Sequence, residues 1–138
     1  MHTLKIKNGD LEALIRITSV SLSFERSRAR NKFLQVIAPL IEARDKSKKE
    51  IIEKFSIKDE EGKTKLTAQG LIDFGDNMKE VDAEWAKLQG EDAVIDVLPS
   101  IEKELQVVKD IIVSSEEKLS PEDSFSLTRI VEAIEAIK

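Results

Sequence analysis

Six apolar residues recur at alternating steps of three and four along one stretch of the chain, which is the spacing of one helix face. They are Leu71, Phe74, Met78, Val81, Trp85 and Leu88. Thr67 precedes them as a candidate N-cap, and Gly90 follows as a C-terminal stop. The pattern predicts a helix that packs this face in the core. The alternative is an exposed seam through which two copies would form a homodimer.

A second and longer apolar stripe begins at Phe24, after the candidate N-cap Ser23, and ends at Phe55. Its members between these ends are Phe33, Val36, Ile37, Leu40, Ile41, Ile51 and Ile52. Pro39 lies inside the stripe. Because proline removes a backbone donor and clashes with the preceding turn, we expect the helix to kink or restart near Ala38.

Two short segments have the composition of β-strands. Residues 4–7 alternate apolar and polar side chains, and residues 93–98 are rich in β-branched side chains and end at Pro99. The two segments can pair as a two-stranded ribbon. Residues 55–66 predict a small hairpin or loop in which Gly62 takes the positive φ of the turn. We find no internal repeat.

Apolar spacing and cap residues predict three further helices, over residues 10–19, 100–112 and 120–138. Ser100 and Ser120 are candidate caps, and Asn8-Gly9-Asp10 is a turn that also offers one. The last helix has one apolar face, made of Phe125, Thr128, Val131, Ile134 and Ile137. The sequence therefore predicts a single helical domain over residues 1–138, a mainly α fold. We expect a compact bundle of four to five helices with a short two-stranded β-ribbon.

The amino-acid composition argues against several kinds of catalytic and metal-binding site. The chain has no cysteine, so it has no disulfide, thiolate nucleophile or zinc–thiolate site. Its one histidine, His2, lies where the terminus is expected to fray. The glycines are scattered singly, and the loop Asp59–Lys63 lacks the alternating ligands of a calcium loop. We therefore expect no catalytic residue, no cofactor and no metal site, and a protein that is not an enzyme.

The most distinctive polar feature is a basic cluster made of Arg26, Arg28, Arg30 and Lys32. On a helix these side chains fan out over two faces rather than converge on one point. A solvated face paired with acids such as Glu25 explains the cluster without a function. The alternatives are contact with phosphates, which salt would weaken steeply, and docking of an acidic protein. The net charge of −5 argues against a nucleic-acid partner as the main one.

Trp85 is the only tryptophan of the chain. Its place in the first apolar stripe predicts that it packs in the core. A partly exposed tryptophan at a partner interface is the alternative, because tryptophan is enriched among the residues that dominate interface affinity.

The order of several motifs resembles small proteins of unknown function that phages and prophages of Gram-positive bacteria encode. The motifs are LKIKNGDL at 4–11, the charged helix 40–55, KDEEGK at 58–63, IDVLPSI at 95–101 and LSPED at 119–123. The resemblance implies a phage context and no particular activity. It assigns no functional residue.

These observations predict a non-enzymatic, phage-type interaction or assembly protein. It would bind a host protein, a phage protein or a second copy of itself through a helical surface. The alternative is a nucleic-acid-associated accessory protein that uses the basic cluster. A small hydrolase with carboxylate chemistry is a third hypothesis, with no residue pattern in its favour. Because no apolar stretch has the length of a signal peptide or a membrane span, we expect a location in the cytoplasm of a bacterial host cell.

Overall fold

The computed structural model describes residues 2–137. This part of the chain contains five α-helices and one two-stranded sheet. The elements in chain order are β1 (His2–Lys7), the 3₁₀ turn η1 (Asn8–Asp10), α1 (Leu11–Thr18), α2 (Phe24–Phe55), η2 (Gly75–Asn77), α3 (Met78–Gly90), β2 (Asp92–Val97), α4 (Pro99–Ser114) and α5 (Pro121–Glu135). The predicted mainly α fold of five helices with a short ribbon is confirmed.

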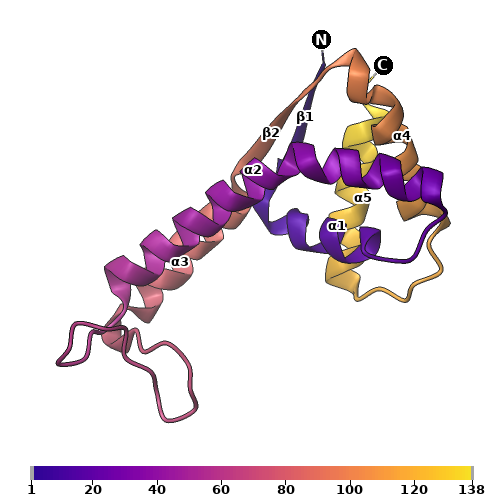
Figure 1. Cartoon of the computed structure of the whole chain (residues 1–138). Coiled ribbons are helices and arrows are strands. Elements are labelled where there is room, and N and C mark those ends of the chain that lie inside the picture. Colours follow the sequence, from indigo (N-terminus) through magenta and orange to yellow (C-terminus); the bar gives the residue numbers. More distant parts are fainter. Residues whose placement is uncertain (1, 138) are drawn as a thin grey trace.

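The molecule has a body and an arm (Figure 1). The body consists of α1, α4, α5, the β1–β2 ribbon and the first half of α2, and the arm consists of the second half of α2 with α3. The core fills the body, and its largest fully buried side chains include Leu4, Leu14, Phe33, Ile37, Leu105 and Ile130. Each such side chain stabilises the fold by about 1.5–3 kcal/mol relative to an exposed one.

The predicted ribbon is confirmed, because β1 and β2 pair antiparallel with Leu4 opposite Ile95. Leu4 and Ile6 of β1 and Ala93, Ile95 and Val97 of β2 point to the core, and the residues between them, including the apolar Val94, face solvent. His2 pairs with Val97. The one histidine therefore lies at the end of the ribbon.

The helix α2 continues through Pro39, so the expected restart near Ala38 does not occur. Figure 1 shows α2 changing direction near the middle of its length, where the arm leaves the body. Pro39 is exposed. Its ring therefore faces solvent rather than the core, and the backbone position that lacks an N–H lies at the surface. The predicted N-cap is confirmed, since the Ser23 hydroxyl accepts a hydrogen bond from the Arg26 N–H at 3.4 Å.

The helix predicted to begin after Thr67 begins only at Met78. Gly70 and Gly75 have φ values of +80° and +53°, which a right-handed helix cannot contain. The apolar stripe is buried only in part. Val81 and Leu88 are buried, whereas Leu71 is 67% exposed. The prediction of one core-facing stripe was therefore wrong for its first half.

Two details of the last helices also differ from the prediction. Leu98 is the N-cap residue of α4, and no side chain caps that helix, so Ser100 does not act as its cap. The buried face of α5 is formed by Ser126, Leu127, Ile130 and Ile134. Phe125, predicted to lie on that face, is 66% exposed. The Ser120 cap is confirmed, because its hydroxyl accepts the Asp123 N–H at 3.1 Å. The last helix was predicted to reach Lys138, but α5 ends at Glu135, and Lys138 itself lies outside the described residues.

A search of the helices in residues 2–137 finds none with the length and apolar character needed to cross a bilayer.

Candidate functional site

The far end of the arm is built from two consecutive hairpin turns, residues 57–74, named here the arm tip (Figure 1). In the first turn the Asp59 N–H donates to the Lys63 carbonyl at 2.8 Å, which confirms the predicted hairpin. In the second, the Thr67 N–H donates to the Leu71 carbonyl at 2.7 Å. The glycines at the matching position of each turn, Gly62 and Gly70, share a φ of +80°.

The two turns form an eight-residue repeat, IKDEEGKT followed by KLTAQGLI. The repeat is one of backbone geometry and not of sequence, because the two copies share only the glycine. The recurring turn glycine is the one clue that the sequence contained.

Three residues spaced eight apart close the arm tip into a ring of backbone hydrogen bonds. The Ile57 N–H donates to the Asp73 carbonyl at 2.8 Å, and the Asp73 N–H donates to the Lys65 carbonyl at 2.9 Å. The Lys65 N–H completes the ring by donating to the Ile57 carbonyl at 2.8 Å. The side-chain amide of Asn77 donates to the Phe55 carbonyl at 3.0 Å and fixes the ring to the end of α2. The arm tip is thus held as one unit.

The surface of the arm tip has an apolar turn and an acidic turn. Leu66 and Leu71 lie on the second turn and are 56% and 67% exposed. The first turn carries Asp59, Glu60 and Glu61 together with Lys58 and Lys63, which leaves it a net charge of −1. Asp59 shapes that turn, since its carboxylate accepts the N–H groups of Glu61 and Lys63 at 2.9 Å each. Glu60 and Glu61 are exposed.

Trp85 lies on α3 within the arm and is partly buried. The Lys48 ammonium of α2 lies 5.1 Å from the centroid of its ring, a cation–π contact between the two helices. Its neighbours on the same face, Val81 and Leu88, are buried. The structure thus places Trp85 in the packing of the arm, and its role at a partner interface stays a prediction.

The structure separates Arg30 from the rest of the basic cluster. Its guanidinium donates to the carbonyls of Thr18 and Val20 at 2.7 and 2.8 Å, and to the Ser27 hydroxyl at 2.9 Å. These carbonyls lie at the C-terminal end of α1, where the helix leaves such groups without partners. Arg30 therefore caps α1 and fixes the linker between α1 and α2.

The other three basic residues, Arg26, Arg28 and Lys32, line a groove between α2 and α4. The Lys32 ammonium donates to the Ser100 carbonyl at 3.0 Å and to the Glu104 carboxylate at 3.2 Å. Lys103 of α4 lines the same groove. Sequence reasoning missed Lys103, because nothing local relates it to a cluster more than 70 positions earlier.

Replacing Glu104 by glutamine should remove a contribution to stability that depends on pH. Burial alone would raise the pKa of Glu104, but a backbone hydrogen bond and the Lys32 ammonium outweigh burial and lower it. A lowered folded-state pKa stabilises the fold above the ordinary pKa of glutamate, about 4.3, and this contribution disappears as the pH falls through the folded value.

The difference in unfolding free energy between the wild type and E104Q should thus be at most about 1 kcal/mol at neutral pH, since Lys32 is half exposed. Urea titrations between neutral pH and about pH 3 should show it shrink toward the acid end. A difference that stays constant over this range would contradict the assignment.

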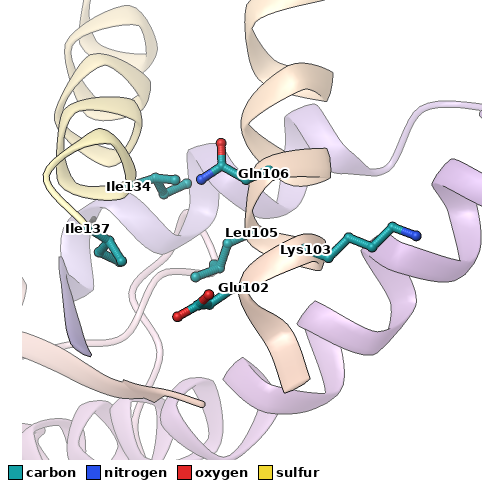
Figure 2. A pocket seen from close by; sticks show the side chains of 6 residues that line it. All are labelled: Glu102, Lys103, Leu105, Gln106, Ile134 and Ile137. Carbon is teal, nitrogen blue, oxygen red and sulfur yellow. The ribbon is translucent and has the colours of Figure 1, made fainter. Parts of the chain in front are cut away.

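A hollow of about 210 Å³ lies between α4 and α5 (Figure 2). Leu105, Ile134 and Ile137 supply its apolar lining, and Glu102 and Gln106 are its polar members. Figure 2 shows Lys103 extending away from the hollow and toward α2. The hollow brings together no acid–base pair beside a nucleophile. Within residues 2–137, no three histidine, aspartate or glutamate side chains are grouped closely enough to hold a metal ion.

Comparison with protein-family models, with curated proteins and with solved structures gives no significant match to this chain. The two candidate sites, the arm tip and the α2/α4 groove, therefore rest on the geometry of this chain alone.

Proposed function

We propose that this chain is a non-enzymatic interaction protein that binds another protein through the arm tip. The observation that carries the proposal is the exposure of Leu66 and Leu71 at the end of an arm that projects from the body. Isolated exposed leucines are common, but these two lie on one rigid turn that the rest of the chain does not cover. The resemblance to phage and prophage proteins supports a phage-type assembly role in the bacterial cytoplasm, with a host or phage protein as partner.

The energetics favour such a contact. Full burial of a leucine side chain contributes about 1.5–3 kcal/mol, so two of them can dominate an interface. The ring of backbone hydrogen bonds fixes the turn before binding, and the entropic cost of ordering it is therefore small. The first turn carries acidic and basic side chains together, and Glu61 pairs with Lys63 at 3.4 Å, so we expect an apolar pocket of the partner to dominate recognition.

The double variant L66S/L71S should lose its partner while the fold is retained. We expect at least a tenfold reduction in the protein captured by the tagged variant from a nuclease-treated bacterial lysate, because both apolar anchors are gone. The control is Phe24→Ser, which changes a large apolar side chain that is 83% exposed on the body. Circular dichroism of each variant checks that it is folded.

The outcomes separate the hypotheses. Capture that F24S retains and L66S/L71S loses supports the proposal, and mass spectrometry then tells a second copy of the chain from another protein. Equal capture by both variants would overturn it. Capture that depends on nucleic acid, and so is absent after nuclease treatment, would also overturn it.

A further inference from the structure

The groove between α2 and α4, of about 290 Å³, joins basic residues that are distant in the sequence. Its charged lining residues are Glu25, Arg26, Arg28, Lys32, Lys103 and Glu104. The two helices run in opposite directions here, since Arg26 contacts Ser114 near the end of α4 and Lys32 contacts Ser100 near its start. Figure 2 shows Lys103 extending from α4 toward α2, and Lys103 lines the groove from the α4 side.

The four cations of the groove divide into two that are anchored and two that are available. Arg26 donates to the Ser114 hydroxyl at 3.2 Å, and Lys32 is held by Ser100 and Glu104. Within residues 2–137, no hydrogen bond or close ion pair holds Arg28 or Lys103, although the Lys103 charge contributes to the lowered pKa of Glu104. The contacts of Arg26 and Lys32 fix the walls of the groove. Arg28 and Lys103 line the same groove and are exposed to solvent.

The local charge is positive although the whole chain carries −5. Four cations face two carboxylates, and one of these, Glu104, is already engaged by Lys32. Such a groove favours a ligand with more than one negative charge.

We infer that this groove binds the phosphate groups of a ligand through Arg28 and Lys103. A phosphate carries between one and two negative charges at neutral pH, and its oxygens fit the planar fork of a guanidinium. A free oligophosphate and a nucleic-acid strand share this chemistry. The groove is a second site, on the body, and is independent of protein docking at the arm tip.

The test is an NMR titration of the isotope-labelled full chain with two separate probes, sodium pyrophosphate and a short single-stranded oligonucleotide. We expect saturable shifts of amide signals from residues 25–32 and 103–107 that weaken as the salt rises from about 50 to 200 mM. The variant R28A/K103A should bind at least tenfold more weakly. Neither side chain has a partner in the fold, so this variant should remain folded, and the same spectra show whether it does.

Two further variants sharpen the result. The matched control K79A/K87A removes two exposed lysines of α3, and it should leave the affinity unchanged. The variant E25Q removes a carboxylate from the groove and should tighten binding about two- to fivefold. Tighter binding of the oligonucleotide than of pyrophosphate assigns the phosphate to a nucleic acid, and the reverse order assigns it to a free oligophosphate.

Three results would overturn the inference. The first is the absence of saturable shifts at the groove for both probes at concentrations up to about 10 mM, since ordinary non-specific binding is already tighter than this. The second is equal affinity of the wild type and R28A/K103A. The third is an equal loss of affinity in K79A/K87A, which would show that net charge alone sets the binding.

Discussion

Replacing Phe33 by alanine is expected to lower the free energy of unfolding by about 3–5 kcal/mol. Phe33 is completely buried on the first half of α2, in the core shared with α1, α4 and α5. The change removes the apolar contacts of the ring and leaves a cavity that the surrounding helices can only partly close. For a chain of this length the loss corresponds to a drop in Tm of about 10–17 °C, measurable by calorimetry.

The control for Phe33 is Phe24, which belongs to the same predicted apolar stripe but is 83% exposed. The F24A variant should change the free energy of unfolding by no more than about 0.5 kcal/mol. Similar Tm values for the two variants would show that α2 does not pack as described.

Replacing Asp10 by alanine should cost about 2–4 kcal/mol. The Asp10 carboxylate is buried in η1 and accepts two hydrogen bonds from Arg129 of α5, at 2.6 Å from Nη2 and 2.9 Å from Nε. The pKa of the Arg129 guanidinium is raised, chiefly by its hydrogen bond to Asp10. The variant loses both charge-assisted bonds and the link between η1 and α5, so urea denaturation should show a clear fall in stability.

An exposed ion pair between α1 and α5 gives the comparison. Arg16 of α1 pairs with Asp123 of α5, but the Arg16 side chain is largely exposed to solvent. The R16A variant should therefore cost less than about 1 kcal/mol. A double-mutant cycle of D10A and R129A measures the coupling directly. If D10A cost no more than R16A, the buried pair would not be what holds α5 to η1.

The motif Asn8-Gly9-Asp10 shows how a local interpretation can be correct and incomplete. The turn is present as η1, but the Asp10 side chain does not cap α1. Asn8 instead donates from its side-chain amide to the Leu88 carbonyl at the end of α3, at 3.0 Å. A Cβ on Gly9 would lie 3.3 Å from the Gln89 carbonyl oxygen, so the small residue allows this close approach. The motif thus links η1 to α3 through Asn8 and to α5 through Asp10, whereas the sequence predicted only the local turn and cap.

The arm tip was the least predictable part of the candidate site. Periodicity extended a helix backward from α3 to Thr67, because Leu71 and Phe74 happen to continue its spacing. The ring that competes with this helix depends on bonds between Ile57, Lys65 and Asp73, which are eight and sixteen positions apart. Such bonds become favourable only when the chain segments have already met, so no local window contains the signal.

The sequence by itself determined the type and the approximate ends of most elements in this protein. Side-chain periods of two and 3.6 and the caps Ser23 and Ser120 act over a few residues, and their physics is complete within a single helix or strand. The tertiary structure alone decided that Phe33 is buried while Phe24 is exposed. It alone placed Lys103 opposite Arg28 and Leu66 at the end of an arm. Burial and charge pairing depend on which surfaces come to face one another, and that follows from the packing of the whole chain.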